Sequence, residues 1–444
     1  MHDRTRRMIC RTVFLALCVV PTIGVFAWSS SRVNPGRTAE SAAELSREVG
    51  LKVSLVGVSY PRPGVSLYDG VELADPETSA PLARMRFLEV AESNSATAIV
   101  ASQPVLDAVQ LGRLWQAVAE RLRQGVVAGK PTRLAARELT LEWPSSSPGG
   151  DSQTLIDVLA ELAAKSEGQH ETTASLSFRL AGSEAPEPVR LRYSRRMEAD
   201  RQPGKASSRV MTRLELDTGG AVVPLSMLTV PIAVVNRLGP QAKFRGRLWA
   251  SETRDGWDGE LTGEFSDVDL QTAIAEQFPH HLAGTATITI ARARFAGGRI
   301  EEARGSLAAG RGVIGQSLLS AAARHLQLAG TAGAASNDAL VPYDQMAFSF
   351  EIDSSGVTIH GQCDSPLGTI VRRGDTALLA EAAGAPVPVS ALLRTLVPQS
   401  EVQVPATRES AWLMRCLPVP QVVTPKGDLP HGKLRIAPTE GSRG

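Results

Sequence analysis

A strict two-residue alternation between residues 243 and 265 restricts the fold more than any other feature of this sequence. Charged or polar residues fill one set of alternate positions. The other set is apolar or glycine: Phe244, Gly246, Leu248, Ala250, Trp257, Gly259, Leu261, Gly263 and Phe265. The central Asp255-Gly256 pair is a strong turn signal. Because successive side chains of a strand point to opposite faces, the pattern predicts an antiparallel hairpin with one covered face.

The same alternation predicts two more hairpins. One joins residues 286–295 to 299–307 through Gly297-Gly298, and the other joins 346–352 to 357–363 through residues 354–356. Further strands are predicted from β-branched content and turn residues at 52–60, 65–73, 82–90, 134–143, 174–180, 189–195 and 210–216. The predicted strands number fewer than twenty.

Helical spacing predicts short amphipathic helices between these strands. They lie at residues 39–49, 111–122, 152–162, 316–328 and 389–396. The first ends at Gly50, a common helix C-terminal residue. The next two rest on Leu111, Leu114, Trp115, Val118 and Leu122, and on Leu155, Ile156, Leu159 and Leu162 after a cap at Asp151 or Ser152. The predicted class is therefore α+β, a mostly antiparallel hairpin-rich body with interspersed amphipathic helices.

The N-terminus carries a separate signal. Arginines at positions 4, 6, 7 and 11 precede seventeen uncharged, mostly apolar residues from Thr12 to Trp28. As a helix this stretch rises about 25 Å, near the lower limit for crossing a bilayer. We predict a single transmembrane anchor with a cytoplasmic N-terminus and Trp28 at the outer interface. Two alternatives are a signal peptide cleaved after Val25-Phe26-Ala27 and a soluble cytoplasmic chain.

Charge and cysteine content exclude several classes of protein. The 47 basic and 46 acidic residues nearly cancel, which argues against a nucleic-acid partner. Four cysteines in 444 residues are too few for a disulfide-rich scaffold or a multi-zinc protein. If the chain is exported, Cys363 and Cys416 lie in an oxidising compartment. They then form one disulfide or stay as two buried thiols.

Motifs for catalysis and cofactors are largely missing. Residues 310–315 match G-x-G-x-x-G, but the preceding strand is polar and belongs to a hairpin, whereas a dinucleotide site needs a buried parallel strand. We attribute these glycines to positive φ angles. Four residues with metal-binding side chains, His360, Cys363, Cys416 and His431, have poor geometry for zinc, because residues three apart on a strand face opposite ways. We therefore predict neither an enzyme nor a cofactor.

Three polar groups are assigned to solvent or loops. His280-His281 follows Pro279 and is predicted to lie in a loop, and the adjacent Glu301-Glu302 pair is predicted to be solvated. The four arginines Arg190, Arg192, Arg195 and Arg196 form either a patch for anionic headgroups or a solvated strand face. We favour the solvated face, because the nearly neutral chain supplies no long-range attraction.

Several segments resemble AsmA-like proteins. They are a helix ending in Glu48-Val49-Gly50 after the anchor, KVSLVGVSYPRPGVSLYDGVELADPET (52–78), GTATITIARARFAGGRIEEARGSLAAGRGVIGQSLLSAAARHL (284–326), MAFSFEIDSSGVTIHG (346–361) and PVSALLRTLVP (388–398). This family is related to TamB-like and bridge-like lipid-transfer proteins. The resemblance implies an inner-membrane anchor, a periplasmic β-rich body with an apolar groove, and a role in envelope lipid handling or outer-membrane assembly.

The resemblance also suggests an organisation of the chain and its partners. The regions are a basic flank and anchor (1–32), an N-terminal AsmA-like α+β region (33–143), a middle α+β region (144–240), a C-terminal AsmA-like hairpin region (241–416) and a proline-rich disordered tail (417–444). The implied partners are a phospholipid or other envelope lipid, the inner membrane and envelope proteins. With fewer than twenty strands at about 4.8 Å each, the body is expected to be too short for bridging.

Two questions stay open at this level. The apolar hairpin faces are covered either by a lipid or by helices and another sheet, as in an ordinary packed core. The function is therefore lipid handling or, alternatively, a membrane-tethered scaffold that binds a protein partner without lipid. An exported enzyme is the third class, and the missing motifs argue against it.

Overall fold

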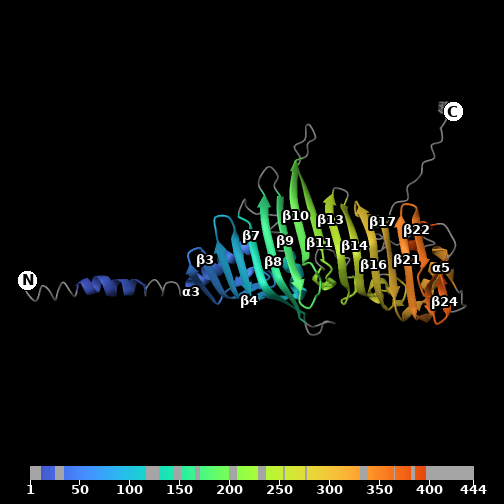
Figure 1. The fold of residues 1–444 in the computed structure, drawn as a ribbon, viewed down its shortest axis with the longest axis horizontal. Coiled ribbons are helices and arrows are strands. Elements are labelled where there is room, and N and C mark those ends of the chain that lie inside the picture. Colours follow the sequence, from blue (N-terminus) through green and yellow to red (C-terminus); the bar gives the residue numbers. More distant parts are fainter. Residues whose placement is uncertain are drawn as a thin grey trace, which may run out of the picture.

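The computed structural model describes residues 12–25, 35–116, 130–143, 152–165, 171–199, 208–228, 237–253, 256–275, 278–330, 339–364, 366–381 and 386–396. A large sheet of 21 strands dominates these residues, beside a small sheet of three. The strands of the large sheet follow one another along the longest axis of the molecule, nearly in chain order (Figure 1). The described part is therefore mostly β, with few and short helices, where the sequence predicted α+β.

The large sheet contains β1 (Lys52–Ser54), β2 (Gly57–Arg62), β3 (Val65–Ala74), β4 (Pro81–Glu92), β5 (Thr97–Ser102), β6 (Val105–Asp107), β7 (Thr132–Glu142), β8 (Gln153–Lys165), β9 (Glu171–Leu180), β10 (Val189–Ala199), β11 (Ser208–Asp217), β12 (Val223–Pro224), β13 (Lys243–Thr253), β14 (Gly256–Asp269), β16 (Thr285–Ala296), β17 (Arg299–Ala309), β19 (Ala329–Gly330), β21 (Gln345–Asp353), β22 (Gly356–Gly361), β23 (Thr369–Arg373) and β24 (Thr376–Ala380). The small sheet contains β15 (Leu282–Ala283), β18 (Gly312–Gly315) and β20 (Leu340–Tyr343).

Helical elements are short. They are the α-helices α3 (Pro35–Val49), α5 (Gln316–His325) and α6 (Ser390–Leu396), the 3₁₀ turns η2 (Ala108–Gln110) and η3 (Leu225–Met227), and the π-helical turns η1 (Leu15–Val19) and η5 (Gln271–Ala275). Helix α3 ends as predicted at Gly50, which adopts φ +75° and donates its N–H to Ser46 O at 2.9 Å. The predicted helices near 316–328 and 389–396 are confirmed as α5 and α6.

Neighbouring strands are antiparallel with few exceptions. The three predicted hairpins are confirmed as β13–β14, β16–β17 and β21–β22, and the single strands predicted between residues 134 and 216 are confirmed as β7, β9, β10 and β11. Among the described strands, the only parallel pairings are those of β7 with β5 and with β6. The chain crosses over between them through η2 and the helical residues 111–116. Val118 and Leu122, the remaining positions of that predicted helix, lie outside the described residues.

The predicted helix over residues 152–162 is wrong. This segment is β8, which pairs with β7 on one side and β9 on the other. A bulge between Ile156 and Leu159, with Asp157 at φ +53°, inserts one residue into the alternation. The buried Leu155 and Val158 therefore stand three positions apart, which resembles helical spacing. Two paired neighbours decide the conformation against local propensity.

The strand count was also too low. The 21 strands of the large sheet exceed the fewer than twenty expected. Four positions in the sheet hold two short strands each: β1 with β2, β5 with β6, β11 with β12, and β22 with β23. The 21 strands therefore fill 17 successive positions, which span roughly 75 Å at about 4.8 Å per step. The larger number of strands weakens the expectation that the body is too short for bridging.

The large sheet continues across two of the proposed region boundaries. Strand β7 bonds to β8 across residue 144, and β11 bonds to β13 across residue 240. The division into regions stays a prediction, and the tail from 417 lies outside the described residues. Residues 12–25 are helical, while Trp28 lies outside the described residues. Within the part of the chain that the structure describes, no helix has the length and apolar character needed to cross a membrane.

Candidate functional site: the apolar face of the sheet

Strand register gathers apolar side chains into rows that run across one face of the sheet. In the base row, Val268, Ala286, Ala309, Met346 and Val371 lie opposite one another on β14, β16, β17, β21 and β23. The middle row is Phe244, Phe265, Ile288, Leu307 and Phe348. The upper row is Leu216, Leu248, Leu261, Ala293, Ala303 and Ile352. We call these three rows, together with Leu191 and Tyr193 of β10, the apolar face.

Burial is complete in the base row, whereas the rows above it mix buried side chains, such as Phe244 and Leu216, with half-buried ones. Every base-row side chain is at most 6% exposed. In the middle row Phe265, Ile288 and Leu307 are half-buried, and in the upper row Leu248 and Leu261 are half-buried as well. Part of this face thus keeps apolar surface in contact with water, which costs about 25 cal/mol per Å² relative to full burial.

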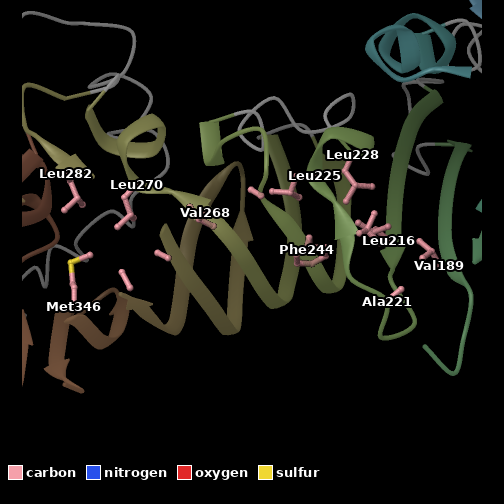
Figure 2. Packing of buried hydrophobic residues seen from close by; sticks show 14 of the residues in the cluster. Val189, Leu216, Ala221, Leu225, Leu228, Phe244, Val268, Leu270, Leu282 and Met346 are labelled. Carbon is pink, nitrogen blue, oxygen red and sulfur yellow. The ribbon is translucent and has the colours of Figure 1, made fainter. Parts of the chain in front are cut away.

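Short segments cover the base row. Leu225 and Leu228 near η3, Leu270 before η5, and Leu282 of β15 join the same cluster of buried side chains as Val268. Figure 2 shows these leucines on segments that lie over the strands carrying Phe244 and Met346. Helix α5 adds Leu319 and Ala322 to the cluster, and α6 adds Ala391. Coverage is therefore complete along the base and incomplete in the rows above it.

A buried histidine connects the segments that cover the base row. His280, 4% exposed, follows Pro279 in the predicted loop. Its Nδ1 lies 3.1 Å from Ser317 Oγ on α5 and its Nε2 lies 2.8 Å from Thr395 O on α6. Desolvation by burial lowers the pKa of His280, and the hydrogen bond with Thr395 partly offsets it. The neutral ring, accepting from Ser317 and donating to Thr395, links the loop to both helices. No local pattern around His280 indicates this role.

Paired charges fill the opposite face of the same strands. Arg245 bonds to Glu264 at 3.3 Å, Arg292 to Glu260 at 3.2 Å, and Arg304 to Glu302 at 3.1 Å. We call this the charged face. The predicted solvation of the Glu301-Glu302 pair is refined, since Glu301 bonds to Arg294 at 2.6 Å. Pairs this exposed contribute little stability, so this face mainly keeps the sheet soluble and apart from other sheets.

Glycines on the apolar face make room for aromatic rings. Gly263 (φ +147°) lies opposite Gly246, and a Cβ on either would press against the Phe244 ring. A Cβ on Gly305 would meet the Phe350 ring in the same way. The rings thus pack over bare backbone, an arrangement that also lets the strands bend.

The G-x-G-x-x-G segment belongs to the small antiparallel sheet. Strand β18 pairs antiparallel with β15 and β20, so the parallel strand that a dinucleotide site requires is missing. The predicted positive φ angles are wrong, because none of Gly310, Gly312 and Gly315 adopts one. Gly312 is instead needed for close packing, since a Cβ there would overlap the Tyr343 ring and Ala283 O.

Only some of the residues considered for a disulfide or a zinc site, Cys363 and His360, lie within the described part of the chain. Cys363 is 5% exposed, and its Sγ lies 3.4 Å from Ile370 O. Cys416 and His431 lie outside the described residues, so the disulfide stays a prediction. His360 Nδ1 lies 3.4 Å from Glu381 Oε2. Within the described residues, no group of three potential ligands is arranged to hold a metal ion.

Register separates the four arginines of β10. Arg190, Arg192 and Arg196 occupy alternate positions on the charged face. Arg195 lies in the same alternate set as Leu191 and Tyr193, and it stands opposite Thr172 on β9 and Thr212 on β11. The predicted solvated strand face is therefore right for Arg190 and Arg192, which are exposed, and wrong for Arg195 and Arg196, which are both half-buried.

No family model and no curated protein matches this chain.

Proposed function

We propose that the chain is an AsmA-like protein, anchored in the inner membrane by residues 12–28, whose periplasmic body holds envelope lipid on the apolar face. In this proposal it handles lipid without catalysing a reaction and contributes to envelope lipid homeostasis or outer-membrane assembly. The observation that carries the proposal is the incomplete coverage of the apolar face. Apolar side chains of the middle and upper rows stay half-buried on consecutive strands. The base row beside them is fully covered.

The chemistry of the two faces supports a lipid occupant. Contiguous half-buried apolar surface marks a binding site for a partner, a membrane or an apolar ligand. The middle and upper rows run across β13, β14, β16, β17 and β21 without an ionised residue. Acyl chains need no hydrogen bonds and fit such a surface. The roughly 75 Å span leaves room for several lipid molecules in succession.

The test is lipid binding by the full chain purified in mild detergent. Native mass spectrometry detects co-purified phospholipid, and labelled lipid in vesicles measures extraction. We expect the unaltered protein to carry and extract phospholipid. Leu261→Glu, which places a charge in the upper row, should reduce extraction about 10-fold, because a carboxylate beside an acyl chain is poorly solvated.

A matched control is Thr262→Glu, which adds the same carboxylate one residue away on the charged face, opposite Arg247. It should leave extraction unchanged, and circular dichroism checks that both variants fold. If the unaltered protein carries no phospholipid and extracts none, the proposal is overturned. The alternative, a membrane-tethered scaffold that binds a protein partner, would then be favoured.

A further inference from the structure

Arg195 is a charged residue in an apolar set of positions. On β10 it follows Val189, Leu191 and Tyr193 on the same face, and the register to both neighbouring strands is continuous through this region. Val189 is 1% exposed and Leu191 is half-buried. The ring of Tyr193 makes an edge-to-face contact with Trp115 at 5.9 Å, which places the helical residues 111–116 over this part of the face.

The Arg195 guanidinium has one unpaired nitrogen. Its Nη1 is buried and forms no hydrogen bond with any residue of the described chain. A buried polar group without a hydrogen-bond partner destabilises the fold, and the cost is larger when the group is charged. Buried polar atoms in native proteins nearly always have partners, so an exception calls for an explanation.

Other arginines of the sheet pair with carboxylates. Arg213, Arg245 and Arg247 each reach a carboxylate on the charged face, at 2.6, 3.3 and 2.9 Å. Arg196 Nε is also unpaired, but Arg196 belongs to the charged face, opposite Glu171 in the register. The residues opposite Arg195 are Thr172 and Thr212, which supply hydroxyls and no charge. Within the described residues, neither neighbouring strand places a carboxylate opposite Arg195, and an anionic ligand suits the unpaired Nη1.

The surroundings indicate what kind of molecule carries that anion. Arg195 lies six positions after Val189, about 20 Å along the strand. That length exceeds the roughly 15 Å of hydrocarbon in one leaflet of a bilayer. Leu191 and Tyr193 lie between them on the same face, and Trp115 contacts the Tyr193 ring from above. A ligand bound here has an anionic group at Arg195 and an aliphatic tail directed toward Val189.

We propose that Arg195 binds the phosphate of a phospholipid whose acyl chains lie along the apolar face. This inference rests on the proposed function and adds to it a fixed position and orientation for one lipid. Arginine suits the role, because its planar guanidinium donates two parallel hydrogen bonds to a phosphate. Thr172 and Thr212 flank the phosphate position, and their hydroxyls provide further donors.

The experiment compares three probes on the full chain in mild detergent: phosphatidylglycerol, a diacylglycerol with the same acyl chains, and inorganic phosphate. We expect the unaltered protein to bind phosphatidylglycerol at least about 10-fold more tightly than diacylglycerol, the value of one charge-assisted hydrogen bond. Arg195→Gln should abolish that preference and leave diacylglycerol binding unchanged. Arg192→Gln, on the same strand and the opposite face, should keep the preference. Arg195→Lys should restore part of it.

Each failure has a separate meaning. If the unaltered protein binds neither lipid, the proposed function itself is overturned. If lipid binds but Arg195→Gln keeps the full preference for phosphatidylglycerol, this inference alone is overturned. Inorganic phosphate that binds at Arg195 as tightly as phosphatidylglycerol would identify a free-ion site and would also overturn the lipid assignment.

Thermal unfolding separates binding from a structural role. In lipid-free protein, Arg195→Gln should leave Tm unchanged or raise it, because the substitution removes an unpaired charge from an apolar face. A drop of several degrees in lipid-free Tm would show that Arg195 supports the fold and would contradict the assignment.

Discussion

The hairpin of β13 and β14 has an apolar face and a charged face, and the same backbone hydrogen bonds hold both faces in place. On one face Phe244 stacks against Phe265, with ring centroids 4.9 Å apart. On the other, Arg245 pairs with Glu264 one residue further along. Stability should therefore be concentrated on the apolar face, whereas the charged face governs solubility and exclusion of other sheets. Four predictions test this division, beginning with the largest expected effect.

Truncation of a buried side chain on the apolar face should be the most damaging change. Phe244 is 2% exposed, and Phe244→Ala removes a ring from a site closed by Val223 and Phe265. We expect local stability to fall by about 3–5 kcal/mol. Hydrogen exchange of the β13 and β14 amides measures this loss directly. Arg245→Ala is the matched control on the opposite face, and an equal loss from the two variants would refute the division.

Loss of the buried histidine link should have an intermediate effect. His280→Ala leaves Ser317 and Thr395 without their partner beneath the cover of the base row. We expect a loss of about 1–3 kcal/mol, seen as a lower Tm and faster exchange in α5 and α6. A variant as stable as the unaltered protein would show that the link is dispensable.

The same link should respond to pH with a definite sign. Burial lowers the pKa of His280 in the folded state below its ordinary value of 6.5, so the unfolded chain takes up its proton first. The contribution of neutral His280 is complete above pH 6.5 and is lost as pH falls through the folded-state pKa. Burial also lowers the pKa of His325, and comparison with His280→Ala removes that shared background. The difference in Tm between the two proteins should narrow as pH falls, and a widening difference would contradict this sign.

An ion pair on the charged face should have the smallest effect. The Arg245 and Glu264 side chains are 50% and 35% exposed, so solvent screens their attraction. A double-mutant cycle of Arg245→Ala and Glu264→Ala should give a coupling of about 0.2–1 kcal/mol, decreasing as salt is added. A coupling of several kcal/mol, unaffected by salt, would mean that the charged face contributes as much as the apolar face.

The sequence predicts the hairpins well because their alternation is local and their turns are marked by glycine. The period of two identifies the face of Phe244 and Leu261 without any knowledge of the neighbouring strands. The same period places Arg195 on the face of Leu191 and Tyr193. Arg195 is nevertheless predicted to be solvated when the four neighbouring arginines are treated as one group. The alternation does not reveal that Arg195 Nη1 is unpaired, because that depends on how other segments pack.

Where the local period is interrupted, sequence reasoning fails. The bulge at Asp157 shifts the alternation of β8 and imitates a helix, and pairing with β7 and β9 determines the outcome. The role of Gly312 depends on the Tyr343 ring, about thirty residues away in the chain. His280 joins segments that are 115 residues apart. Such contacts are properties of the assembled fold, and no window of neighbouring residues reveals them.

Most strands of the large sheet bond to the strands that precede and follow them in the chain. Such a body approximates a one-dimensional array, in which each hairpin interacts chiefly with the next. Local hairpins close with little loss of loop entropy, so folding can begin at several of them and spread along the sheet. The pairing of β17 with β21 spans a long intervening segment, and the parallel joint of β5 and β6 with β7 closes only after its crossover has been ordered. We therefore expect that joint to be the slow step, where an N-terminal block and a growing C-terminal array meet.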